Sequence, residues 1–161
     1  MIGYSVNTST GALSGATNSA VASAPNHVAA TQATNPLVYA ACSGGTVDYI
    51  AVASFGGAAT QVAAGTTPLS MTVNKTETKA FVSNSGAGTV SIYSMSNGTL
   101  SLAGTVTACT TPGQLTINAA GYAYLVCRGD NKVNAYSLGT DTLSLVGSYT
   151  TGTTPASVAG Y

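Results

Sequence analysis

The chain has 161 residues, only 5% of them charged, and its formal net charge is zero. Typical globular proteins carry about 25% charged residues, so this composition excludes the electrostatic footprint of proteins that bind nucleic acid or anionic lipid. The length fits one domain, and no apolar run approaches the roughly 18 residues of a spanning helix, so we expect no membrane span.

The polar residues are mostly Thr, Ser, Asn and Gly rather than Lys and Glu. A surface hydrated by neutral hydroxyl and amide groups suits an exported or surface-exposed bacterial protein. We therefore expect an extracytoplasmic location, which includes the periplasm, the cell surface and the secreted state.

A repeat of about 43 residues organises the chain. Four prolines recur every 43 or 44 residues, at Pro25, Pro68, Pro112 and Pro155. The last three of these four each follow a Thr-Thr pair. The repeat divides the single domain, 1–161, into the parts 1–24, 25–67, 68–111, 112–154 and 155–161.

The elements of each repeat follow in the same order. Residues 2–5 match a third strand, so the chain opens halfway through a repeat. Each full repeat starts after its proline with an alternating strand, in which Val28, Met71 and Leu115 hold equivalent positions. A turn (34–36, 74–76 or 118–121) precedes a second apolar strand, at 37–40, 80–82 and 122–126; a Gly-rich turn then precedes a third, at 89–93 and 133–136. The fourth strand begins at Leu100 or Leu143, in one case after the turn dipeptide Asn97-Gly98.

These units predict an all-β fold, a β-propeller of four-stranded antiparallel blades. Three blades are complete, and strands of partial blades remain at both ends, where residues 158–161 match a first strand. We expect one of three arrangements. The chain forms an open arc, it is part of a longer polypeptide, or identical chains or a protein partner complete a ring with it. A sandwich, barrel or solenoid is the alternative. The tyrosines at repeat positions should pack in the core; they are Tyr4, Tyr49, Tyr93 and Tyr136.

The segment 82–93, with the sequence VSNSGAGTVSIY, resembles the YVTN-type repeat of bacterial and archaeal surface-protein propellers. The wider pattern is similar to lactonase-type seven-bladed propellers related to 6-phosphogluconolactonase, and the likeness covers nearly the whole chain. The resemblance implies a propeller fold and, as an alternative function, hydrolysis of a sugar lactone. Pro25-Asn26-His27 resembles the Pro-Arg-His signature of some lactonase-family blades, with Asn26 in place of the arginine.

In an up-and-down blade, the entries to the first strands and the turns between second and third strands share one face, which is the usual ligand face. The candidates it collects are Asn26, His27, Ser70, Gln114, Arg128 and Asp130. His27, the only histidine, is a candidate general base. A base needs an orienting acid, however, so a structural role near the central channel is the other interpretation.

Arg128-Gly129-Asp130 spells the integrin-binding tripeptide on a predicted exposed turn. This placement is what an adhesion motif requires. The alternative to an adhesion motif is an ordinary solvated turn, in which Gly129 provides the backbone conformation.

The three cysteines, Cys42, Cys109 and Cys127, have no zinc-site spacing. We expect no metal and no other cofactor. Cys109 and Cys127 fall on one face of the same blade, so a disulfide is compatible with an oxidising compartment. We expect buried free thiols instead.

The scarcity of ionisable groups favours a non-catalytic propeller that acts as a scaffold or interaction module. A lactonase-type hydrolase is the alternative, and a carbohydrate-binding or adhesion module is the second alternative. The chain has no tryptophan, which removes the best stacking surface for a sugar.

Overall fold

The computed structural model describes residues 1–22, 24–32, 35–97 and 99–160. Thr34 and Gly98, which are expected in turns, and Tyr161, which ends the match to a first strand, lie outside the described residues. The predicted all-β blade fold is confirmed: three four-stranded antiparallel sheets follow a two-stranded pair, and each sheet keeps its strands in chain order.

The first elements are the pair β1 (Ile2–Val6) and β2 (Leu13–Asn18). The first sheet comprises β3 (Pro25–Ala30), β4 (Leu37–Cys42), β5 (Thr46–Ala51) and β6 (Thr60–Ala63), with a short 3-10 helix, η1 (Val52–Ser54), after β5. The second comprises β7 (Pro68–Val73), β8 (Lys79–Asn84), β9 (Thr89–Ser96) and β10 (Thr99–Thr107). The third comprises β11 (Pro112–Ile117), β12 (Tyr122–Cys127), β13 (Lys132–Leu138) and β14 (Leu143–Thr150), with η2 (Arg128–Asp130) after β12.

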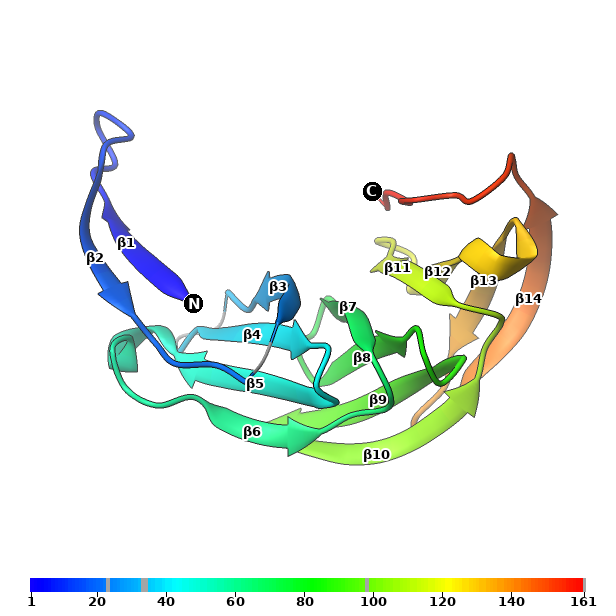
Figure 1. Ribbon diagram of the computed structural model, residues 1–161, viewed down its shortest axis with the longest axis horizontal. Helices are drawn as coiled ribbons and strands as arrows, with labels where there is room; N and C mark the ends of the chain where they lie inside the picture. Colours follow the sequence, from blue (N-terminus) through cyan, green and yellow to red (C-terminus); the bar gives the residue numbers. More distant parts are fainter. Residues whose placement is uncertain (23, 33–34, 98, 161) are drawn as a thin grey trace.

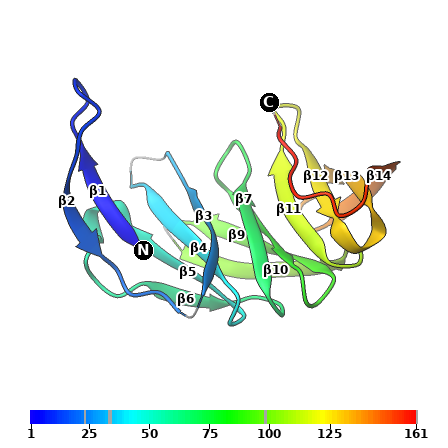
Figure 2. The same ribbon diagram turned by 45° about the horizontal axis from the view of Figure 1, so that its top comes forward.

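The sheets stand side by side along an arc, as blades do around a propeller axis (Figure 1). The innermost strands β3, β7 and β11 lie on the concave side, and β6, β10 and β14 lie on the convex side (Figures 1 and 2). The arc is open between the β1–β2 pair and the C-terminal segment.

Prolines begin all three innermost strands, as the repeat predicts. Proline lacks a backbone N–H, so it is tolerated at the start of an edge strand. The residue before each proline has a positive φ, as at Thr67 (53°) and Thr111 (48°), and the register shifts directly after each proline. The Thr-Thr-Pro element is therefore a kinked entry that sets the start of each blade.

Two apolar clusters join the sheets. One lies between the first and second sheets and includes Tyr39, Met71 and Tyr93. The other lies between the second and third sheets and includes Leu115 and Tyr136. Tyr93 and Tyr136 are buried, as predicted. Because each sheet contributes one face to each neighbour, the core of the molecule is the set of contacts between blades.

Val28, Met71 and Leu115 hold equivalent positions in the repeat but are not equally buried. The three residues share the same register, but Val28 is 55% exposed whereas Met71 and Leu115 are 1% and 2% exposed. Tyr4 is likewise 51% exposed although Tyr93 is fully buried. Tyr4 belongs to the two-stranded β1–β2 pair and Val28 to the first four-stranded sheet, and within the described residues no four-stranded sheet covers this face of either one.

The C-terminal segment also differs from the prediction. Residues 155–160 form no strand. Val158 nonetheless reaches the innermost strand β11 through its backbone N–H. Among the described residues, no helix is long and apolar enough to cross a membrane.

Candidate functional site

The face of the blade entries is held together by the Thr-Thr pairs. The carbonyl of Thr67 accepts the N–H of Ser85 (2.8 Å), and the carbonyl of Thr66 accepts the N–H of Gly86 (3.1 Å). The third sheet repeats this arrangement with Thr111, Thr110 and the first two residues of η2. A Cβ on Gly86 would lie 2.9 Å from Thr67 Oγ1, so the close approach of the two turns requires glycine.

Three of the predicted ligand-face residues link an innermost strand to the next segment along the arc, which is an innermost strand in two cases and the C-terminal segment in the third. His27 Nδ1 accepts the N–H of Met71 (3.4 Å), and Ser70 Oγ accepts the N–H of Leu115 (3.3 Å). Gln114 Oε1 accepts the N–H of Val158 (3.1 Å). We call these three contacts the inner-strand hydrogen bonds. Each acceptor stands two residues after its proline, so one repeat position serves the same purpose in every blade.

The inner-strand hydrogen bonds have a clear physical reason. An innermost strand is an edge strand, and alternate N–H groups along its open edge lack a partner within the sheet. A buried N–H without an acceptor is costly. The side chain from the preceding blade supplies that acceptor and also fixes the spacing between blades.

Asn26 strengthens the same contact. Its side-chain Nδ2 donates to the carbonyl oxygen of Pro68 at 2.8 Å. Asn26 and His27 therefore both contact β7, at Pro68 and at Met71, and both contacts join the first two blades.

The hydrogen bond at Nδ1 determines which ring nitrogen of His27 carries the proton. Since Nδ1 accepts a backbone N–H, the neutral ring carries its proton on Nε2. Burial lowers the pKa of His27 below its ordinary value of 6.5, which favours this neutral form. The ring is therefore equipped to donate a hydrogen bond from Nε2 rather than to accept a proton there.

The four acids that could orient a histidine are each engaged elsewhere. Asp48 is buried and accepts from Thr46 Oγ1 (2.8 Å), and Asp141 forms an ion pair with Lys79. Glu77 accepts the N–H of Gln32 at 2.6 Å, and Asp130 accepts the N–H of Thr110 at 3.0 Å. These contacts hold the carboxylates to structural donors.

Arg128 and Asp130 lie in the third blade. Their tripeptide forms η2, and the hydrogen bond from Thr110 holds the pKa of the exposed Asp130 carboxyl below its usual range. The Arg128 side chain packs on Gly113, where an added Cβ would lie 3.1 Å from Arg128 Cδ. Arg128 therefore lies against Gly113 in the third blade, whereas Asn26 and His27 belong to the first blade.

The expectation of free thiols is wrong for two of the three cysteines. Cys109 and Cys127 form a disulfide, with Cα atoms 5.8 Å apart, and Cys42 is free and buried. The disulfide joins the entry of the third blade to the end of its second strand. A carboxylate oxygen of Asp130 lies within 4.8 Å of both sulfurs, but disulfide sulfurs are not thiolates and do not offer a metal the ligand it needs.

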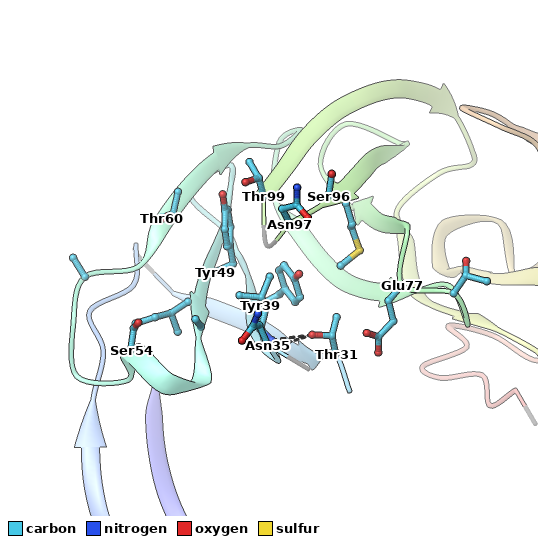
Figure 3. Close-up of a pocket in the computed structure, with 16 residues that line it drawn as sticks. Thr31, Asn35, Tyr39, Tyr49, Ser54, Thr60, Glu77, Ser96, Asn97 and Thr99 are labelled. Atoms are coloured by element: carbon cyan, nitrogen blue, oxygen red, sulfur yellow. Dashed lines mark hydrogen bonds between the residues drawn. The ribbon is translucent and has the colours of Figure 1, made fainter. Parts of the chain in front are cut away.

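A cavity that the sequence analysis did not predict lies between the first and second blades. Its volume is about 750 Å³, and its lining includes Tyr39, Tyr49 and Glu77 (Figure 3). It is bounded by the β7–β8 turn, at the end of β7 opposite Pro68. The available signal was the hydroxyl of Tyr39, the third residue of β4, where the third residue of β8 is Phe81.

No protein-family model matches the sequence, and no curated protein matches it. The fold does match solved structures. A candidate 6-phosphogluconolactonase from Bacteroides uniformis aligns with a TM-score of 0.76 and 21% identity over 92% of this chain and 49% of its own. The periplasmic gluconolactonase of Pseudomonas aeruginosa aligns with a TM-score of 0.77 and 15% identity over 92% of this chain and 50% of its own.

A functionally unknown protein from Desulfotomaculum acetoxidans aligns with a TM-score of 0.73 and 18% identity over 90% of this chain and 47% of its own. Identities at this level establish shared architecture and leave activity open. The chain spans about half the length of these three proteins, and it has the blade fold of the lactonase-like β-propellers.

Proposed function

We propose that the protein is a lactonase-type hydrolase, or the propeller part of one, that opens the ring of a sugar lactone. The observation that carries this proposal is the fold match over 92% of the chain to the Bacteroides and Pseudomonas proteins, both named for lactone hydrolysis. This match favours the lactonase alternative over the non-catalytic scaffold that composition suggested.

In the proposed reaction, the oxygen of water adds to the lactone carbonyl carbon and the ring C–O bond breaks. One proton of the water passes to the released ring oxygen and the other to solvent, so the product is a hydroxy carboxylate. Negative charge develops on the carbonyl oxygen. His27 is suited to donate a hydrogen bond from Nε2 to that oxygen, because its Nδ1 is already the acceptor for Met71.

The test is hydrolysis of gluconolactone above its spontaneous rate, by the unmodified chain and by His27→Asn. In asparagine, Oδ1 replaces Nδ1 as the acceptor for Met71 and nothing replaces Nε2, so the blade contact is kept. We expect turnover by the unmodified chain and a loss of about 10²- to 10³-fold in kcat for the variant, the usual effect of removing one oxyanion donor. Full activity in His27→Asn would assign His27 to the blade contact alone.

A non-catalytic scaffold is the second candidate function. The observation that favours it is that the three inner-strand hydrogen bonds engage His27, Ser70 and Gln114. Absence of turnover above the spontaneous rate in the unmodified chain would support the scaffold and contradict the hydrolase.

We also propose an extracytoplasmic compartment for either function. The Cys109–Cys127 disulfide supports this proposal, because disulfides persist mainly in oxidising compartments.

A further inference from the structure

The three inner-strand hydrogen bonds differ in one chemical property. Each acceptor stands two residues after a proline and receives a backbone N–H from the next segment along the arc. The hydroxyl of Ser70 and the amide of Gln114 do not titrate near neutral pH, so they remain acceptors in weak acid. The imidazole of His27 is the acceptor of the three that weak acid protonates.

Protonation of His27 removes the acceptor of its contact. The ring accepts the N–H of Met71 at Nδ1, with 3.4 Å between the two nitrogens. In the imidazolium form both ring nitrogens carry a proton and neither can accept a hydrogen bond. The Met71 N–H and the new Nδ1–H then face each other as two donors, so the hydrogen bond between β3 and β7 is lost.

The burial of the two partners makes this loss unfavourable and still allows it to occur. Met71 is 1% exposed, and a buried N–H left without an acceptor carries the penalty of its desolvation. His27 is half-buried, so part of the residue stays in contact with solvent and a proton can reach it. Acid therefore acts on a solvent-accessible group, and the effect falls on a buried one.

The strands around His27 carry few other titratable groups. β3 packs against β4 and β7, and the described residues of these three strands include no Asp, Glu, Lys or Arg. Their other titratable side chains are Tyr39 and Cys42, both on β4. Burial raises the pKa of Tyr39 to about 12 and also raises the pKa of the Cys42 thiol, so both are neutral in weak acid. Glu77 accepts the N–H of Gln32, beyond the far end of β3.

The direction of the pH effect follows from the state of the ring. Burial lowers the pKa of His27 below its ordinary value of 6.5 in the folded protein, whereas the unfolded chain keeps the ordinary value. Below pH 6.5 the unfolded chain therefore binds the proton more readily than the folded protein does. The stability that the neutral ring contributes is present above pH 6.5 and is lost as the pH falls from 6.5 to the lower pKa of the folded protein.

We propose that His27 makes the contact between the first and second blades an acid-sensitive joint. At neutral pH, Nδ1 accepts the Met71 N–H and holds the two innermost strands together at this point. In weak acid the ring takes up a proton and the joint opens at Met71, while the hydrogen bond from Asn26 to Pro68 and the other inner-strand hydrogen bonds are kept. This property is independent of lactone hydrolysis, because it requires the Nδ1 acceptor and no substrate.

The test is amide hydrogen exchange of the full chain at about pH 8 and about pH 5, followed by NMR. The result is expressed as protection relative to the unfolded sequence at the same pH, which removes the pH dependence of the exchange chemistry itself. We expect the protection of Met71 to fall by about tenfold in acid, the usual effect of one lost hydrogen bond. The protection of Leu115 and Val158, whose acceptors do not titrate, should stay the same.

His27→Gln is the matched control. Glutamine already serves as the acceptor two residues after Pro112, so this variant keeps an acceptor for Met71 without a titratable group. Its Met71 protection should be the same at both pH values. A fall of equal size in His27→Gln would contradict the histidine as the cause, and an equal fall at Leu115 in the unmodified chain would contradict a local joint.

The titration of the ring gives a second measurement, which needs no variant. The NMR shifts of the His27 ring and of the Met71 N–H should follow the pH with one shared midpoint below 6.5. The proposal is overturned by a ring that titrates at or above 6.5, by a Met71 N–H that does not respond to the ring, or by unchanged Met71 protection in acid.

Discussion

Tyr93→Ala is expected to destabilise the protein by about 3–5 kcal/mol, the usual cost of truncating a large buried aromatic side chain. Tyr93 is fully buried in the cluster between the first and second blades. Its hydroxyl also donates to the carbonyl of Ala63, so the truncation removes both a packed ring and a hydrogen bond between blades. Urea unfolding of the two proteins measures the difference.

Tyr4→Ala is the matched control for Tyr93→Ala. Tyr4 occupies the same repeat position but is 51% exposed, so its truncation should cost below about 1 kcal/mol. Similar losses of unfolding free energy at the two positions would show that burial between blades does not determine the stability. A loss below about 1 kcal/mol at Tyr93 would contradict the assignment of this residue to the buried face of its strand.

Reduction of the Cys109–Cys127 disulfide is expected to lower the free energy of unfolding by about 3 kcal/mol. The cysteines are 18 residues apart, and closing a loop of about this length restricts the unfolded chain by that amount. Thermal or urea unfolding with and without a thiol reductant gives the measurement, and the expected result is a clear downward shift of the midpoint under reducing conditions.

Cys109→Ala provides the control for the reductant. This variant should start with the lower stability and should show no further shift when the reductant is added. Cys42 is free and buried, so it gives no reductant-sensitive step. A midpoint of the unmodified chain that is independent of the reductant would contradict a stabilising disulfide.

The blade architecture was predictable because it repeats. The proline period placed the starts of β3, β7 and β11, and apolar alternation placed the strands that follow. The interval from β5 to β6 was harder, since η1 and the residues after it interrupt the pattern of the other repeats. The exposure of Val28 could not be read from the period, because burial depends on a neighbouring sheet and not on register.

The roles of individual polar residues were less accessible. His27, Ser70 and Gln114 differ chemically, so they form no recognisable motif, yet all three can accept a hydrogen bond two residues after a proline. That shared property was the available signal. The cavity at Tyr39 depends on side chains from two blades and on the absence of a partner for one hydroxyl among the described residues, which the sequence pattern does not contain.

Successive sheets pack face to face around a common axis, with their innermost strands joined. Amide hydrogen exchange at Leu115 tests it directly, because this N–H lies on an innermost strand and is satisfied by Ser70 of the preceding blade. We expect slow exchange at Leu115, comparable with that of amides inside β8, and selectively faster exchange at Leu115 in Ser70→Ala. Exchange at the rate of an unprotected amide in the unmodified chain would contradict the stacked blades.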